Sequence, residues 1–342
     1  MSGWRVWRWT LWIGVPAAVA VVAYRDRAVL ADAAAILARA RLGWLVPGVA
    51  AIGGVYLCRA FVYGIPLRLL RYSFARAFLW RVALMSTSLH QVIPAGGASG
   101  YAFLTYALHQ RGVPAGEASV IALVDTLSYA AAVAALVVAS LVYLLTAGML
   151  AEPSIVRALP PGLALFLAGA AVYYVQRDRG RLFRVVLGLR RWVARLGWRW
   201  REQGVRTFLR DYLTAKSIVA GSRAAFVRMV GLQFLAVGCD ALALCTTFAA
   251  LGIAPPVWTV FMGLVVAMAG GAVVAAPGGG GSFELIMTAF FAAHGVPPER
   301  GLAAAVLYRV LAFWLPVTVT VVLLLDLRRR HRAIRRQRRR AT

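Results

Sequence analysis

The sequence predicts an all-α polytopic membrane protein with about six spanning helices and two inverted hairpins, each hairpin either re-entrant or a broken pair of helices. Three observations support this fold class. The chain is 61% hydrophobic and only 15% charged, with a mean hydropathy of +0.74, whereas a soluble domain is roughly half apolar. It contains several long apolar runs, and it contains a Pro- and Gly-rich pattern that occurs twice.

Six apolar runs are long enough, or nearly so, to cross the ~30 Å hydrocarbon core of a bilayer. They lie at 10–24, 45–66, 119–147, 159–175, 231–252 and 301–326. The first run follows Arg5 and Arg8, so a cleaved signal peptide is an alternative interpretation of it. An uncleaved first helix is favoured because the polar stretch 24–26 follows directly.

Two further regions, 78–111 and 258–294, have a different character. Each holds an apolar arm, a Pro-Gly break and a second arm that is too short to span comfortably. Irregular backbone at membrane depth survives only where protein or a water-filled cavity satisfies it. Such breaks in two similar halves are typical of a transporter, with chance similarity as the alternative. Pro94, Gly96, Gly97 and 112–114 recur as Pro277, Gly279, Gly280 and 295–297. Each residue of the first copy is separated from its counterpart in the second by the same number of residues, and we call this separation the repeat offset.

Basic residues predict the orientation, because Lys and Arg accumulate in cytoplasmic loops. The segment 176–230 carries fourteen basic residues and three acidic ones, and the tail 327–342 carries nine arginines. Both segments and both termini are therefore expected in the cytoplasm. The first hairpin is then expected to begin and end on the cytoplasmic side of the membrane, and the second hairpin is expected to begin and end on the outer side. The repeats 45–147 and 231–326 are thus expected to be inverted within one integral domain, 1–342, of a cell inner membrane.

The net charge of +26 is interpreted as a signal of topology and of contact with anionic lipid of the inner leaflet. Nucleic-acid binding is not expected, because the basic residues lack an element with polar readout groups. The stretch 181–200 is predicted to form an amphipathic helix on the membrane surface, with a solvated loop as the alternative. Cys58, Cys239 and Cys245 show no metal-ligand or redox spacing, so they are interpreted as core residues and neither a metal nor a cofactor is expected.

Few ionisable side chains fall inside the apolar segments, where each costs about 2.5–3.5 kcal/mol. Glu284 lies in the short arm of the second hairpin, and Arg309 lies in the last predicted helix. The two are expected either to form a structural salt bridge or to hold a zwitterionic or anionic head group. The further candidates for substrate binding are Asp125, Tyr308, Asp240 and Arg111.

Other polar residues of the apolar segments receive simpler interpretations. Gln233 precedes Asp240 on the same predicted helix, and both are expected to face the interior of the bundle. Arg59 and Arg81 lie nearer the ends of their segments, so their side chains are expected to snorkel to the interface.

The helix breaks form a second set of candidates. They comprise Pro94, Gly96, Gly97 and Gly100 at the first break, and Pro277, Gly278, Gly279, Gly280, Gly281 and Ser282 at the second. Amides of the second run are expected at the start of the following helix, where the positive end of the dipole favours an anion such as a lipid phosphate. No Gly-Lys-Ser/Thr follows, so nucleotide binding is not expected.

These features resemble a known family. The blocks that carry the resemblance are 94–97 with Gly100, 277–284, 295–297, 307–309 and 314–316. Over about 40–326 the chain is similar to the lysylphosphatidylglycerol synthase transmembrane family of flippase-like proteins, which is related to the flippase half of the bacterial multiple peptide resistance factor. The resemblance implies movement of a lipid or a lipid-linked solute between leaflets, with Glu284, Arg309 and the Pro-Gly breaks as functional positions. No soluble aminoacyl-transferase domain is apparent, and 98–101 departs from many relatives, which leaves the lipid open.

The expected function is lipid translocation without nucleotide hydrolysis, and the expected partner is a membrane phospholipid, anionic or aminoacylated. The protein is expected not to be an enzyme. One alternative is a membrane transferase with Glu284 or Asp125 as its base, and another is a non-catalytic partner of a lipid-modifying enzyme. A small soluble substrate and a homo-oligomeric assembly are left open.

Overall fold

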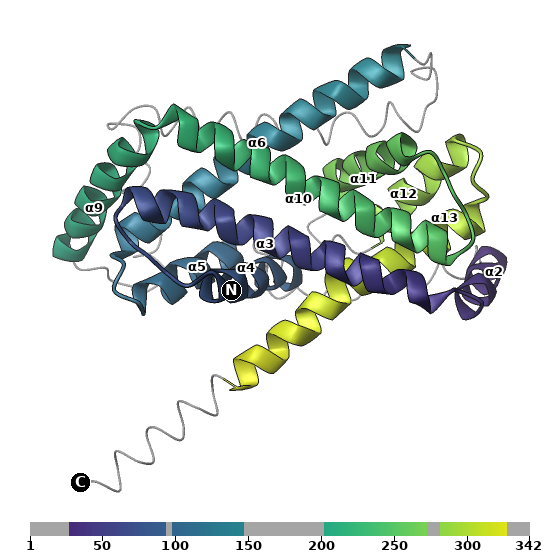
Figure 1. Ribbon diagram of the computed structural model, residues 1–342, viewed down its shortest axis with the longest axis horizontal. Coiled ribbons are helices and arrows are strands. Elements are labelled where there is room, and N and C mark those ends of the chain that lie inside the picture. The colour runs from purple at the N-terminus through teal and green to yellow at the C-terminus, as the bar shows by residue number, and fades with distance from the viewer. Residues whose placement is uncertain (1–26, 94–97, 147–201, 272–280, 327–342) are drawn as a thin grey trace, which may run out of the picture.

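The computed structural model describes residues 27–93, 98–146, 202–271 and 281–326, which fold into helices joined by short turns, without a strand (Figure 1). A 3₁₀ turn, η1 (Leu42–Trp44), precedes α3; a π-helical turn, η4 (Val310–Trp314), follows α13 and continues into a helix over 315–326. The α-helices are α2 (Arg27–Ala38), α3 (Leu45–Leu69), α4 (Arg76–Val92), α5 (Ala98–His109), α6 (Ala115–Thr146), α9 (Glu202–Ala220), α10 (Arg223–Ala250), α11 (Val257–Gly271), α12 (Ser282–Ala293) and α13 (Pro298–Arg309).

The spanning helices are largely those that the sequence predicts. Within the described residues, four helices are long and apolar enough to cross a membrane, namely Leu42–Leu69, Ala115–Ser140, Arg223–Ala250 and Pro298–Asp326. They correspond to four of the six predicted runs, while 10–24 and 159–175 lie outside the described residues.

One boundary differs from the prediction, because α10 begins at Arg223 and not at residue 231. The Ser222 side chain caps the helix by accepting a hydrogen bond from the Ala225 amide (3.3 Å). The long side chains of Arg223 and Arg228 are exposed, so charge in these first turns does not end the helix.

α3 and α10 form the centre of the molecule and lie side by side across Figure 1. A Cβ atom added at Gly48 would lie 2.5 Å from Thr246 Oγ1, and one added at Gly54 would lie 3.2 Å from Cys239 Sγ. Residue numbers therefore rise along one helix while they fall along the other, which makes the pair antiparallel. Small residues at the contact allow the two helix backbones to approach closely.

Two short helices cover each end of this central pair. α4 packs on α5 and α11 packs on α12, in separate hydrophobic clusters with opposite ends of α3. These helices are the arms of the predicted regions 78–111 and 258–294, and their helical structure is confirmed. The breaks at 94–97 and 272–280, with Pro94, Gly96, Gly97 and 277–280, lie outside the described residues. Whether the hairpins are re-entrant stays a prediction.

The halves of the chain correspond in secondary structure at the repeat offset. When the repeat offset is added to the first residues of α4, α5 and α6, the resulting positions lie within two residues of the first residues of α11, α12 and α13, respectively. The turns before α6 and α13 also share backbone hydrogen bonds: the Val113 amide donates to Leu108 O (3.2 Å), and the Val296 amide donates to Phe291 O (3.0 Å). The glycine before each valine has a positive φ, 89° in one turn and 81° in the other. The repeated sequence pattern therefore marks a repeated backbone turn.

In each half, the C-terminal end of the last long helix contacts the other half. In the C-terminal part of α6, Ser140 donates a hydrogen bond to Met262 Sδ of α11 (2.9 Å). In the helix over 315–326, Thr320 donates to Ser88 Oγ of α4 (2.9 Å). Figure 1 shows these two helix ends leaving the body in opposite directions. The last long helix of each half thus packs against the first short helix of the other.

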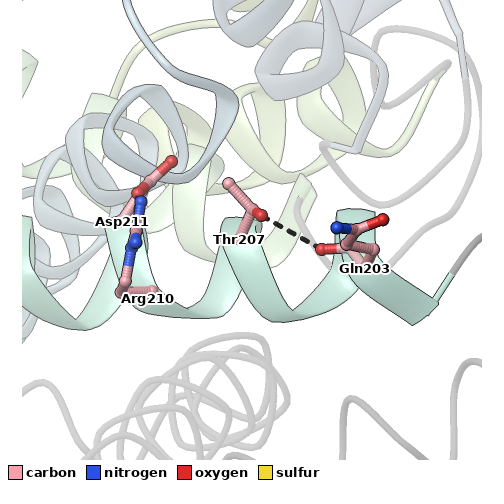
Figure 2. A network of polar contacts seen from close by, with 4 residues as sticks. All are labelled: Gln203, Thr207, Arg210 and Asp211. Carbon is pink, nitrogen blue, oxygen red and sulfur yellow. Dashed lines mark hydrogen bonds and ion pairs between the residues drawn. The ribbon is translucent and has the colours of Figure 1, made fainter.

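α9 lies within the predicted basic segment 176–230 and packs along α6. The predicted amphipathic helix at 181–200 lies outside the described residues. Figure 2 shows polar residues of α9: Thr207 donates to Gln203 O (3.0 Å), and Arg210 Nε lies 3.6 Å from Asp211 Oδ1. The Arg210 side chain is 79% exposed, so this ion pair contributes little to stability. The face that α9 turns toward α6 is apolar and buried, and it includes Tyr212, Ala215 and Val219.

Candidate functional site

Glu284 and Arg309 meet where α12 packs on α13. Arg309 Nε lies 2.8 Å from Glu284 Oε1, and the Arg309 and Glu284 side chains are 15% and 20% exposed. The Nε–H bond is not aimed at that oxygen, so the contact is an ion pair without a directed hydrogen bond. Glu284 Oε2 is buried and has no hydrogen-bond partner among the described residues. The predicted pair is confirmed, and part of its carboxylate is unsatisfied.

Aromatic rings hold the guanidinium of Arg309. Its Cζ atom lies 4.5 Å from the centroid of the Phe283 ring and 5.8 Å from that of Phe313, distances at which a cation–π attraction operates. The π-helical turn η4 follows Arg309 directly, and Pro316 after it lacks the N–H that a regular α-helical turn uses. Single π turns inside α-helices are frequent at functional sites.

Tyr308 connects the ion pair to the central helix α10. Its ring stacks on Phe283 with a centroid distance of 5.8 Å and an interplanar angle of 17°. Its hydroxyl donates a hydrogen bond to Asp240 Oδ1 (3.2 Å), and Asp240 lies in the middle of α10. Four predicted site residues, Glu284, Arg309, Tyr308 and Asp240, therefore form one continuous set of contacts.

Asp125 forms a second buried contact with α10. The residue lies on α6 and is 3% exposed. Gln233 donates from Nε2 to Asp125 Oδ1 (2.9 Å), and the same nitrogen lies 3.5 Å from Ser128 Oγ. Gln233 Oε1 is buried and has no hydrogen-bond partner within the described ranges. The prediction that Gln233 faces the interior is confirmed.

Arg59 of α3 lies between these contacts, and its expected role as a snorkelling side chain is wrong. Its Nε atom is buried and makes no hydrogen bond to the part of the chain that the structure describes. Its Cζ atom lies 5.7 Å from the centroid of the Tyr129 ring. Its charge interacts electrostatically with both Asp125 and Asp240. The prediction failed because α3 packs on α6 and α10, which enclose the Arg59 side chain within the bundle.

The two halves place different chemistry at equivalent positions. At the repeat offset, Tyr101 of α5 corresponds to Glu284, and Thr126 of α6 corresponds to Arg309. The side chains of Tyr101 and Thr126 are in hydrogen-bonding contact. The first half therefore joins its second short helix to its long helix by a neutral contact, where the second half uses an ion pair. This contact was not predicted from the sequence, although applying the repeat offset to Glu284 and Arg309 identifies Tyr101 and Thr126 as the equivalent residues.

Residues 10–320 match the family described as the lysylphosphatidylglycerol synthase TM region. The chain belongs to this family. The match includes both halves of the repeat, and with the four spanning helices it identifies a multi-pass membrane protein. Comparison with curated proteins finds no match.

Two predicted positions of this lysylphosphatidylglycerol synthase TM region lie apart from the charged contacts. Arg111 is exposed on the turn after α5, and its Cζ atom lies 4.6 Å from the centroid of the Phe78 ring. Gly100 lies at the contact of α5 with α4, where an added Cβ atom would lie 2.5 Å from Ser86 O. Gly100 is therefore required for helix packing.

α12 begins directly after Gly281, the last glycine of the second break. The helix starts at Ser282, and Gly281 has a φ of 83°, while 277–280 lie outside the described residues. Glu284 places a negative charge in the first turn of α12, which reduces the attraction of this helix end for a phosphate. Across the described ranges, no three His, Cys, Asp or Glu side chains are grouped as ligands for a metal ion.

Proposed function

We propose that this protein moves a membrane phospholipid, or a solute linked to a lipid, between the two leaflets. The head group would pass the polar side chains between the halves while the acyl chains stay in the bilayer. Membership of a family named for lysylphosphatidylglycerol supports a role with membrane lipid, and it favours an anionic or aminoacylated phospholipid as the substrate. The proposal involves no covalent change in the lipid and no cofactor.

One observation carries this proposal: charged and polar atoms are buried without hydrogen-bond partners among the described residues. They include Arg59 Nε, Gln233 Oε1 and Glu284 Oε2, which lie in or beside helices that can span a membrane. An unsatisfied buried polar group costs about 1–3 kcal/mol, and more when it is charged. An aminoacylated or zwitterionic head group carries both a phosphate for Arg59 and an ammonium for Glu284.

The relation between the halves supports exposure of this site to each side of the membrane in turn. α3 and α10 correspond within the repeat and run antiparallel, as a two-fold axis in the membrane plane requires. The contacts that each last long helix makes with the other half are consistent with the same axis. We therefore propose inverted repeats with re-entrant or broken hairpins, in a cell inner membrane with both termini in the cytoplasm.

Leaflet exchange in proteoliposomes tests the proposal. The labelled lipids are phosphatidylglycerol, lysylphosphatidylglycerol and phosphatidylcholine, and the proteins are the wild type, Arg59→Gln and Glu284→Gln. Both variants are expected to exchange lipid about tenfold more slowly or worse, because each removes a charged contact of the head group. Arg81→Gln is the matched control, since Arg81 is exposed on α4 and should exchange as the wild type does.

Each result of that experiment has a definite reading. Unchanged exchange in Arg59→Gln and Glu284→Gln, from protein that elutes as a folded monodisperse species, would overturn the proposal. Absence of exchange with every lipid, together with a new lipid product in mass spectra of the membranes, would indicate a transferase. Absence of both would favour a non-catalytic partner of a lipid-modifying enzyme.

A further inference from the structure

A groove away from the Glu284–Arg309 pair opens between the end of α3 and the start of α10. Its volume is about 680 Å³, and its walls come from α3, the turn 70–75, the start of α4 and α10. The two long walls belong to the candidate spanning helices Leu42–Leu69 and Arg223–Ala250. The groove therefore lies along the ends of two helices that are long and apolar enough to cross a membrane.

The floor of the groove is apolar, and glycines keep it open. Gly64 of α3 and Gly231 of α10 line it, and a Cβ atom added at Gly231 would meet no atom within 4 Å. Farther along the floor, Leu57 and Leu235 are 43% and 57% exposed. A long apolar channel between two spanning helices fits an acyl chain.

Three arginines line the polar end of the groove: Arg68 at the end of α3, Arg76 at the start of α4 and Arg228 near the start of α10. The Cζ atom of Arg76 lies 5.5 Å from the centroid of the Phe61 ring, which also lines the groove. Among the described residues that form the lining, none is acidic. The groove therefore joins concentrated positive charge to an apolar floor.

An acid close to this end, Glu117, is already engaged. Tyr72 of the lining donates a hydrogen bond to Glu117, which lies in the first turn of α6. Partial burial, followed by this hydrogen bond, raises the pKa of Tyr72 above its ordinary value, so the hydroxyl keeps its proton. The three arginines remain available for an anion.

We propose that this groove binds one anionic diacyl phospholipid, with the phosphate among Arg68, Arg76 and Arg228 and one acyl chain along the floor. Guanidinium groups bind phosphate oxygens through paired hydrogen bonds. A free phosphate would use the arginines and leave the apolar floor unused, and a soluble peptide would have to reach the spanning part of the helices. The site goes beyond the proposed transport, because it requires neither Glu284 nor Arg59.

Native mass spectrometry of the full-length protein in detergent tests this site, with phosphatidylglycerol and phosphatidylcholine as the added lipids. The wild type is expected to retain phosphatidylglycerol in preference to phosphatidylcholine. The triple variant R68Q/R76Q/R228Q is expected to lose about tenfold or more of that retention, because the arginine–phosphate contacts supply the preference. The matched control is R39Q/R41Q/R300Q, which removes the same charge from exposed arginines near α2 and the start of α13 and should bind as the wild type does.

A second pair of variants tests the acyl-chain floor without a change of charge. Gly231 and Gly238 both lie on α10, and an added Cβ atom meets nothing within 4 Å at either position. Only Gly231 lines the groove. Gly231→Leu is expected to lower phosphatidylglycerol retention about fivefold or more by occupying the floor, whereas Gly238→Leu should leave it unchanged.

Several outcomes would overturn the site: equal retention of the two lipids by the wild type, full retention by R68Q/R76Q/R228Q, or an equal loss in the matched control. Equal effects of Gly231→Leu and Gly238→Leu would exclude the acyl chain from the floor. A wild type that binds phosphatidylglycerol in this groove but exchanges no lipid would uphold the site and overturn only the proposed transport.

Discussion

The contact of α5 with α6 and the contact of α12 with α13 occupy the same place in the two halves, yet one is neutral and the other is charged. Tyr101 and Thr126 share a hydrogen bond, whereas Arg309 Nε lies 2.8 Å from Glu284 Oε1. A hydrogen bond between uncharged groups is worth about 1 kcal/mol. An ion pair taken out of water leaves a costly buried charge when one partner is removed. The two halves therefore share a scaffold, but loss of one partner should destabilise the protein more at the charged contact than at the neutral one.

The difference extends to the contacts with α10. Asp125 and Tyr308 correspond at the repeat offset; the first accepts a hydrogen bond from Gln233, and the second donates one to Asp240. The carboxylate thus comes from the long helix in one half and from α10 in the other. α6 also runs as an unbroken α-helix where η4 interrupts the second half. A substrate that passed between the halves would meet different groups on its two sides.

Removal of one charge from the second half should have the largest effect. Glu284→Gln leaves Arg309 without its counter-charge, so we expect the free energy of unfolding to fall by about 3 kcal/mol. Tyr101→Phe, at the equivalent position, should lower it by about 1 kcal/mol. Unfolding of the detergent-solubilised protein by sodium dodecyl sulfate measures both values. An equal loss in the two variants would show that the contacts are energetically alike.

Neutralisation of both partners separates stability from transport. Glu284→Gln combined with Arg309→Gln leaves no unpaired charge, so the double variant should be about 2 kcal/mol more stable than Glu284→Gln alone. Leaflet exchange should nevertheless stay as slow as in the single variant. A double-mutant cycle supplies the coupling energy, and proteoliposome exchange supplies the rate. Recovery of exchange in the double variant would mean that the two charges serve folding alone.

Most of the helical scaffold could be predicted from the sequence, because apolar runs and Pro-Gly breaks are local signals. The arms of both broken regions and the turns at 112–114 and 295–297 follow from these signals alone. The Glu284–Arg309 pair could also be predicted, since few charges occur in the apolar segments and those present require a partner.

The remaining contacts depend on how helices rotate against one another, which the sequence does not encode locally. Arg59 was misinterpreted because only the packing of α3 on α6 and α10 brings its charge to two aspartates. Tyr101 and Thr126 are uncharged, so their burial in a membrane segment is not costly enough to single them out in the sequence. α9 was missed because its arginines obscured a helical apolar spacing from Leu209 to Val219.

The short helix pairs differ in which arm carries the small residue. In the first half, an alanine at Gly100 of α5 would bring Cβ to 2.5 Å from the backbone oxygen of Ser86. In the second half, an alanine at Gly263 of α11 would meet the Phe291 ring at 2.8 Å. Backbone cannot give way as a side chain can, so Gly100→Ala should cost about 1.5 kcal/mol and Gly263→Ala less. Midpoints of thermal unfolding test this order, and a larger loss at Gly263 would contradict it.

The turns before α6 and α13 are where the halves agree most closely, so equal substitutions there should have equal effects. Gly112 and Gly295 have φ of 89° and 81°, and an added Cβ atom would meet nothing within 4 Å at either position. The cost of Gly112→Ala or Gly295→Ala is therefore conformational, about 1 kcal/mol each. Thermal unfolding of both variants should show the same decrease in midpoint. Unequal decreases would mean that the surroundings of the turns, and not their common backbone, determine how firmly each long helix is joined to its hairpin.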